Sequence, residues 1–242
     1  MLTCPDCSSD KIIMYGKTHY GKQRYRCKEC LRQFVESDNH TVSVEKRGYI
    51  ENLLRERISL RGICRSLGVS MTWLMSFAAS IWETTPADIG VDWELLANLS
   101  DDELQSIELQ VDEMWSFVGN KKNKRWIWVV YCPAIKQTLA FHIGSRGKAD
   151  AQRLFDKLPQ RLRNNCQFAT DYWEAYYQTI ASEQHRPSKA LTYFIEGYFT
   201  GVRARVSRLV RRSVSFSKKE ENHVAAIGYF LWQRNLAAHH YL

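Results

Sequence analysis

Four cysteines near the start of the chain constrain its fold more than any other feature. They form two CxxC pairs, Cys4 with Cys7 and Cys27 with Cys30, and 19 residues separate the pairs. Each pair lets two thiolates from one tight turn reach the same ion, and two such turns close a tetrahedral four-cysteine zinc site. Reactive or redox-active cysteines are the alternative, which two matched pairs disfavour.

The segment that carries these cysteines is too short to fold on apolar burial alone. About 40 residues bury little surface, so a structural Zn²⁺ would supply the folding energy. The stretches "IIMYG" and "QRYRC" between the pairs are typical of the strands of a hairpin. We therefore predict a zinc ribbon over residues 1–40.

A helix-turn-helix is predicted over residues 41–82. Residues 60–74 have the pattern of two helices joined at Gly68, where glycine favours the left-handed conformation, and Ser70 would cap the second helix. An ordinary helical hairpin that packs a core has the same apolar periodicity, but the basic chain and the preceding ribbon favour DNA binding. The residues expected at the DNA are Ser70, Thr72 and Trp73.

The distribution of charge indicates a polyanionic partner. The 242 residues carry a formal net charge of +8. Eight acidic and no basic residues lie between Glu83 and Glu108, so the rest of the chain carries +16. We interpret residues 83–106 as an acidic, solvated linker with one short helix near residues 93–99. The surplus elsewhere suits nucleic acid, although a soluble basic protein without such a partner has the same composition.

Residues 107–242 are predicted to form a mixed sheet flanked by helices. Asn120 and Asn123 would turn the first strand into the second. The predicted strands are residues 107–118, 125–132, 138–143, 166–170 and 191–195. The predicted helices are residues 148–158, 172–181, 196–211 and 220–238.

The first of these strands, "IELQVDEMWSFVG", contains two adjacent carboxylates. Successive strand side chains alternate between faces, so Asp112 and Glu113 point in opposite directions and at least one of them faces a packed layer. A charge in that position is costly unless it is paired or bound to metal.

Two further carboxylates stand at the ends of predicted elements. Asp171 follows an apolar strand and Glu196 begins a long helix, and each has a simpler explanation, as a helix cap or as a favourable charge at a helix N-terminus. Together with Asp112 they can converge on two Mg²⁺ or Mn²⁺ ions. Such a pair can clamp the attacking and leaving oxygens of a phosphoryl displacement.

A basic run follows Glu196. Residues 201–219 contain seven basic and no acidic side chains. Arg205, Arg208 and Arg212 recur at spacings of three and four, which predicts one charged stripe on a helix that would guide a DNA backbone. A solvated helix face is the alternative. The residues of this run expected to bind DNA are Arg203, Arg205, Arg208, Arg212 and Lys218.

Three stretches, "VDEMWSFVGNKKNKRWIWVVY", "ATDYWEAY" and "FIEGYFTGVRARVSRLVRRSVSFSK", resemble the DDE transposases of the IS1 insertion-sequence family. The zinc ribbon and helix-turn-helix fit the same family. The resemblance implies an RNase H-like fold for residues 107–242, with Asp112, Asp171 and Glu196 as the catalytic ligands of Mg²⁺ or Mn²⁺. It also implies that Asp112, and not Glu113, faces the metals.

By this resemblance the chain would bind terminal inverted repeats and catalyse two-metal cleavage and strand transfer of an insertion sequence. The implied partners are double-stranded DNA, at element ends and target, and further copies of the chain. The implied location is the cytoplasm of a bacterium or archaeon, at the nucleoid, without a membrane partner. Because both parts stand in one chain, a complete transposase is expected.

One position departs from the family pattern, since Phe199 stands where an Asn commonly follows the catalytic Glu, and that substrate contact does not carry over. Two alternative functions stay open. One is a catalytically inactive DNA-binding regulator derived from a transposase. The other is a structure-specific RNase H-like nuclease, which would cleave DNA without joining it.

Overall fold

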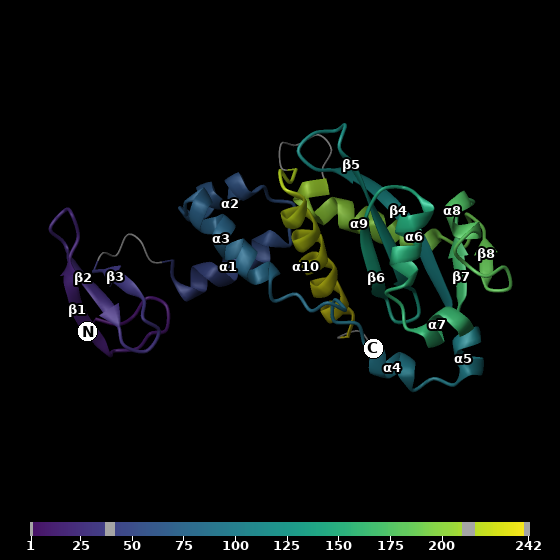
Figure 1. The fold of residues 1–242 in the computed structure, drawn as a ribbon, viewed down its shortest axis with the longest axis horizontal. Coiled ribbons are helices and arrows are strands. Elements are labelled where there is room, and N and C mark those ends of the chain that lie inside the picture. The colour runs from purple at the N-terminus through teal and green to yellow at the C-terminus, as the bar shows by residue number, and fades with distance from the viewer. Residues whose placement is uncertain (1, 37–41, 210–215, 240–242) are drawn as a thin grey trace. The chain divides into compact units, whose positions relative to one another are not determined.

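The computed structural model describes residues 2–36, 42–209 and 216–239 (Figure 1). The chain separates into two compact units, one that ends at Tyr49 and one that begins at Ile50. Within the described ranges no helix is both long and apolar enough to cross a membrane.

The first unit is built on three antiparallel strands in the order β1-β2-β3, and its first hairpin confirms the strands predicted between the cysteine pairs. Ser8 and Leu31, the residues directly after Cys7 and Cys30, both adopt left-handed backbone conformations with φ of 60° and 61°. The two cysteine turns therefore share one backbone shape. The strands are β1 (Ile12–Lys17), β2 (Gln23–Cys27) and β3 (Gln33–Val35).

Three helices follow: α1 (Val44–Leu54), α2 (Leu60–Leu67) and α3 (Met71–Trp82). The turn between α2 and α3 lies where it was predicted. Gly68 ends α2 in a left-handed conformation with φ of 63°, and the Ser70 hydroxyl caps α3 by accepting a hydrogen bond from the Trp73 N–H.

The second unit contains a five-stranded mixed sheet in the order β6-β5-β4-β7-β8, with β4 at its centre (Figure 1). The β4, β5 and β6 strands are antiparallel, whereas β7 is parallel to both β4 and β8. A mixed sheet was predicted, and four of its five strands lie within two residues of the predicted ranges. The strands are β4 (Glu108–Phe117), β5 (Lys124–Cys132), β6 (Gln137–Gly144), β7 (Gln167–Thr170) and β8 (His185–Pro187).

Asn120 makes the predicted turn between β4 and β5. Its side-chain oxygen accepts hydrogen bonds from the backbone N–H groups of Lys122 and Asn123, and the Asn123 amide donates to the Val118 carbonyl. These local bonds fix the hairpin and therefore the register of β5 against β4.

Helices cover both faces of the sheet. One face, to which Glu113 belongs, is covered by α6 (Lys148–Phe155) and α8 (Glu174–Tyr177). The face of Asp112 is covered by α9 (Tyr193–Arg205) and α10 (Glu220–His239). A short helix that the sequence did not predict, α7 (Gln160–Asn165), lies between α6 and β7 along the chain.

The predicted strand at residues 191–195 is wrong. The last strand is β8, and α9 already begins at Tyr193. The apolar, aromatic composition of this stretch is typical of a strand, yet Tyr193 and Phe194 are 72% and 58% exposed. A tertiary contact decides the outcome, because the Gln110 side chain accepts a hydrogen bond from the Ile195 N–H in the first turn of α9.

Three predicted helices are shorter than expected. The helix predicted at residues 148–158 ends at Phe155. The helix predicted at residues 172–181 is limited to α8. The helix predicted at residues 196–211 starts three residues earlier and ends at Arg205, because Val206 adopts an extended conformation. Residues 210 and 211 lie outside the described ranges.

Residues 83–106 pack on the sheet instead of being solvated throughout. Two short helices occur there, α4 (Trp93–Ala97), close to the predicted one, and α5 (Asp101–Gln105), which was not predicted. Most acidic side chains of this segment are exposed, while most of its large apolar side chains face the core. The buried residues are Ile89, Val91, Leu96 and Leu104.

The C-terminal half of α3 packs on α10. Ala78 and Trp82 form a small apolar cluster with Tyr229, and Arg55, just after α1, donates a 2.9 Å hydrogen bond to Gln233. The second unit therefore includes the α2–turn–α3 segment as well as the sheet.

Candidate metal centres and nucleic-acid interface

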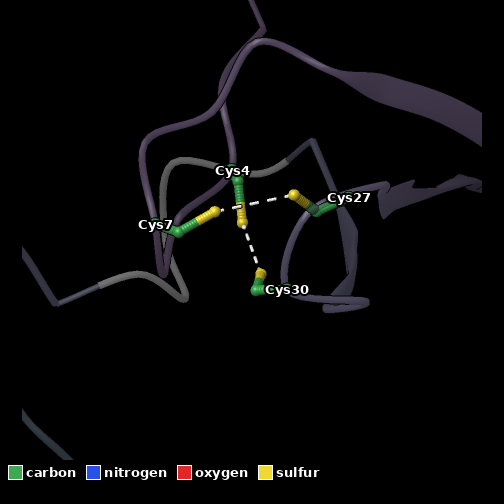
Figure 2. A group of neighbouring side chains, drawn as sticks. All are labelled: Cys4, Cys7, Cys27 and Cys30. Atoms are coloured by element: carbon green, nitrogen blue, oxygen red, sulfur yellow. Dashed lines mark hydrogen bonds between the residues drawn. The ribbon is translucent and has the colours of Figure 1, made fainter.

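The four predicted zinc ligands converge in the first unit (Figure 2). The Sγ atoms of Cys4 and Cys30 lie 3.4 Å apart, those of Cys7 and Cys27 lie 3.6 Å apart, and all four sulfurs are within 4.8 Å of one another. Tetrahedral zinc with Zn–S bonds of about 2.3 Å requires sulfurs roughly 3.8 Å apart. The donor set and its spacing therefore fit a structural Zn²⁺.

The local backbone favours the ligand form of at least one thiol. The backbone N–H groups of Cys30 and Glu29 lower the pKa of Cys27 to about 7, which stabilises its thiolate. By contrast, burial raises the pKa of Cys132, and it raises that of Cys166 to about 12. Both thiols are fully buried, so they serve as packing residues.

Asp112 and Asp171 are brought together by the parallel pairing of β4 and β7. Gln110 pairs with Ala169, and Asp171 follows β7 directly, so the same register continued by two residues sets Asp171 beside Asp112 on one face. One oxygen of Asp171 accepts a 2.9 Å hydrogen bond from the Trp173 N–H. Asp171 therefore stabilises its own turn and also lies next to Asp112, but it is not a helix cap, since the N-cap of α8 is Trp173.

Glu196 occupies the first turn of α9 and is exposed. Its position depends on Gln110, which is 2% exposed and accepts a 2.8 Å hydrogen bond from the Ile195 N–H. The sequence prediction missed this role of Gln110. The available signal was that Gln110 lies two residues before Asp112, on the same face of β4.

The three carboxylates influence one another electrostatically. Burial raises the pKa of Asp112 to about 7, and the negative charges of Glu113, Asp171 and Glu196 act in the same direction. The backbone N–H of Glu113 opposes this effect, since it donates a 2.7 Å hydrogen bond to Asp112 Oδ1. A divalent cation would relieve such mutual repulsion.

The three carboxylates are less tightly clustered than the four thiols. Among the described residues, the four cysteines are the one group of three or more His, Cys, Asp or Glu side chains whose ligand atoms all lie within 4.8 Å. A pair of cations about 3.5–4 Å apart spreads its ligands more widely than a single ion does. Three carboxylates on one face, without basic partners in contact with Asp112, fit oxygen-ligated cations of the magnesium type.

Glu113 has different surroundings. Its carboxylate is 1% exposed and lies 2.6 Å from the Arg146 guanidinium, and its second oxygen accepts a 2.5 Å hydrogen bond from the Tyr176 hydroxyl. The guanidinium stacks on two indole rings, with its carbon 4.6 Å from the centroid of Trp126 and 3.9 Å from that of Trp173. Protein groups therefore satisfy Glu113 without a metal.

The predicted DNA-binding residues of α3 differ in exposure. The Ser70 hydroxyl is used as a helix cap, Thr72 is exposed, and Trp73 is half-buried and stacks on Phe77 with ring centroids 4.9 Å apart. Of the three, Thr72 is the side chain most open to a ligand.

The predicted arginine stripe is wrong, because α9 ends before Arg208. Arg205, exposed at the end of α9, pairs with Glu56 at 2.6 Å. Arg208 instead turns inward and donates a 2.7 Å hydrogen bond to Ser217, with its guanidinium 4.7 Å from the Trp82 ring centroid. Burial lowers the pKa of Arg208 to about 10. Of the remaining predicted residues, Arg203 and Lys218 are exposed, and Arg212 lies outside the described ranges.

Known proteins are similar to both parts of the chain. A family model described as IS1 transposase matches residues 106–237, more than half of the sequence. The chain belongs to the IS1 transposase family. A second model, described as the InsA N-terminal domain, matches residues 1–31 of this IS1-family chain and covers the four cysteines.

Several curated relatives of this IS1-family chain are named InsB. An InsB protein of insertion element iso-IS1n from Shigella dysenteriae is 31% identical over 122 residues, which cover 50% of the chain and 92% of that protein. An InsB protein of element IS1 4 from Escherichia coli K12 is 34% identical over 122 residues and is covered to 72%. The matched half corresponds in length to the mixed-sheet part of the chain.

Proposed function

We propose that this IS1-family chain is a DNA transposase that binds terminal inverted repeats and uses Asp112, Asp171 and Glu196 to cleave and join DNA strands. One observation carries the proposal. The central strand of a mixed sheet, the end of its parallel neighbour and the first turn of the covering helix each bring a carboxylate to the same face.

The topology supports an RNase H-like assignment for the sheet. Three antiparallel strands precede two shorter strands that are added on the other side of β4, parallel to it. Such an arrangement places the middle of β4 and the end of β7 at one site. An RNase H-like fold is also what the resemblance to DDE transposases implies.

Each carboxylate would serve as an oxygen ligand, held by a different part of the fold. Asp112 is fixed by the β4 backbone, Asp171 by its bond to the Trp173 N–H, and Glu196 by the Gln110 contact that anchors α9. Bound Mg²⁺ or Mn²⁺ would stabilise charge on the attacking and leaving oxygens of the phosphodiester. The chain itself supplies orientation, which is most of what phosphoryl transfer requires of a protein.

DNA recognition is proposed for the zinc ribbon and for the helix-turn-helix of α2 and α3. The exposed Thr72 and the first turn of α3 would meet base edges, while basic side chains of the ribbon would contact phosphates. Two element ends must be held together for joining, so the active form would be a homo-oligomer on double-stranded DNA.

The departure at Phe199 concerns packing more than substrate. Phe199 is 3% exposed and belongs to the core of the sheet unit. A side chain buried at this position cannot touch DNA in this arrangement. The departure at Phe199 is therefore compatible with strand cleavage and joining.

Strand transfer tests the proposal directly. Labelled duplexes that carry the repeat flanking the gene would be incubated with plasmid, Mg²⁺ or Mn²⁺, and wild-type protein, Asp112→Asn or the control Glu108→Gln on the same strand. We expect metal-dependent joined product from wild type and Glu108→Gln only. Cleavage without joining would identify a structure-specific nuclease, and binding without cleavage would identify an inactive regulator.

A further inference from the structure

A basic groove opens on the side of the sheet covered by α9 and α10. Its volume is about 510 Å³, and its walls come from the residue after α1, the β5–β6 turn and the ends of α9 and α10. None of the described side chains that line it is acidic. Its polar lining residues are Arg55, Tyr131, Lys136, Arg205, Gln233 and Arg234.

Four cations from four separate elements meet in this groove: Arg55, Lys136, Arg205 and Arg234. One acid stands next to them, since Glu56 pairs with Arg205 at 2.6 Å. Arg55 is bound to the uncharged Gln233. The groove therefore has a surplus of positive charge, and a polyanion is the chemical class that complements it.

Lys136 is held in a conformation that a lysine rarely adopts. Its φ is +56°, in the left-handed region that favours glycine, and its side chain is exposed. Folding alone would favour glycine at this turn. A strained residue that projects a charge into a groove indicates a binding role for that charge.

Arg234 is oriented by aromatic rings. Its guanidinium carbon lies 4.8 Å from the ring centroid of Tyr198, which in turn stacks on Tyr131 with centroids 4.7 Å apart. Among the described residues no carboxylate forms an ion pair with Arg234. The aromatic rings thus position its charge at the groove.

The groove and the three carboxylates lie along the same helix. Glu196 is in the first turn of α9 and Arg205 is its last residue. Nine helical residues span about 14 Å. Because B-form DNA rises by about 3.4 Å per base pair, this separation corresponds to roughly four base pairs of a bound duplex.

We propose that this groove binds the phosphate backbone of duplex DNA about four base pairs from the strand held at the carboxylates. The proposal rests on the proposed function for its ligand and adds a contact site that neither the zinc ribbon nor α3 provides. Both the element end and the target DNA offer the same phosphates, so the contact would be independent of sequence.

Binding would be measured with the full, zinc-loaded chain in buffer without added Mg²⁺ or Mn²⁺, where metal-dependent cleavage cannot occur. Fluorescence anisotropy would follow two labelled duplexes of equal length, one with the flanking repeat and one of scrambled sequence, from about 50 to 300 mM KCl. The variants are Lys136→Gly and Arg234→Gln, and the control is Lys148→Gln, an exposed lysine of α6 on the opposite face. Thermal unfolding would accompany each measurement.

We expect Lys136→Gly to keep or raise the melting temperature and to weaken binding of both duplexes several-fold. Arg234→Gln should also weaken binding of both duplexes. Each lost phosphate contact should flatten the plot of log Kd against log[KCl] by about one unit of slope. Unchanged affinity and slope in both variants would overturn the groove as a DNA site. Equal loss of affinity for both duplexes would confirm a sequence-independent backbone contact, and a loss confined to the flanking repeat would contradict it.

The test is separate from that of the catalytic proposal. A chain that binds DNA but never cleaves it still gives a result without added Mg²⁺ or Mn²⁺, so loss of activity and loss of the groove are distinguishable. Inorganic phosphate at millimolar concentration serves as a competitor. If it abolished the difference between wild type and Arg234→Gln at constant ionic strength, the groove would be a site for small anions and the proposal of a duplex site would fail.

Discussion

Glu113 and Arg146 form an ion pair at 2.6 Å whose carboxylate is 1% exposed and whose guanidinium lies against two indole rings. One of these rings belongs to Trp173, whose backbone N–H holds Asp171. A chain of contacts thus runs from the residue beside Asp112 to the turn that carries Asp171. Glu113, on the opposite face of β4 from Asp112, therefore helps to hold the turn that carries Asp171.

Removing this carboxylate should destabilise the second unit. Glu113→Ala leaves a partly buried guanidinium and a buried phenol without their acceptor, so we expect the free energy of unfolding to fall by about 2–4 kcal/mol. Glu113→Gln keeps the shape and one acceptor oxygen and should cost less. Urea denaturation measures both, with Glu108→Ala on the same strand as a control. Equal stability of Glu113→Ala and the control would contradict the ion pair.

Gln110 should matter for the placement of Glu196. Gln110→Leu leaves the buried Ile195 N–H without an acceptor, which should cost about 1–3 kcal/mol. We also expect cleavage to fall further than the unfolded fraction explains, because the first turn of α9 would lose its anchor to β4. Gln167→Leu is a matched control, since its hydrogen bond to Arg186 is exposed. The idea would be abandoned if Gln110→Leu cleaved at the wild-type rate while folded.

His223 should make stability depend on pH. It is fully buried, its Nε2 lies 2.8 Å from the Ser116 hydroxyl, and burial lowers its pKa to about 4, with the positive charge of Arg208 acting in the same direction. Arg125 adds to this effect and Glu220 opposes it. The unfolded chain, with a histidine pKa near 6.5, therefore binds the proton more readily.

The stability contributed by neutral His223 is complete above pH 6.5 and is lost as the pH falls towards 4. This corresponds to about 2 kcal/mol at pH 5 relative to pH 8. Chemical denaturation at several pH values would measure it, and His223→Gln should show a shallower decline over this window. A variant with the same decline as wild type would show that other groups govern the acid sensitivity.

Removal of zinc should unfold the first unit while leaving the second folded. The described part of the first unit that contains the four cysteines buries Cys4 and Cys27 but few other side chains, so little besides the ion stabilises it. We expect about one zinc per chain by elemental analysis, and rapid proteolysis within residues 2–36 after chelation or in Cys27→Ser. Cys166→Ala, which removes a buried thiol of the second unit, should keep its zinc. Protease resistance after complete removal of zinc would contradict a metal-dependent ribbon.

Local sequence signals predicted the parts of this fold that depend on local physics. The cysteine spacing, the glycine at position 68 and the asparagines of the β4–β5 turn each act through their own backbone, and each element lies where it was expected. The position of Asp112 on a strand followed in the same way from the apolar residues around it, whereas the central place of that strand in the sheet depends on distant pairing.

Elements decided by distant contacts were not predictable. Tyr193 and Phe194 are residue types typical of a strand. The hydrogen bond that the Gln110 side chain accepts from the Ile195 N–H instead favours a helix. Arg208 fits a helical stripe by spacing, yet its contacts with Ser217 and Trp82 draw it inward beyond the end of α9. The prediction of a solvated linker at residues 83–106 rested on the charges of this segment, whereas its few apolar residues determine where it packs.

The packing of α3 on α10 has a consequence for how such chains diversify. Ala78 and Trp82 share an apolar cluster with Tyr229, so a helix pair from another protein in place of α2 and α3 would present the wrong surface to α10. The exposed first turn of α3, around Thr72, lies outside this cluster, so point substitutions there can change the surface without disturbing the packing.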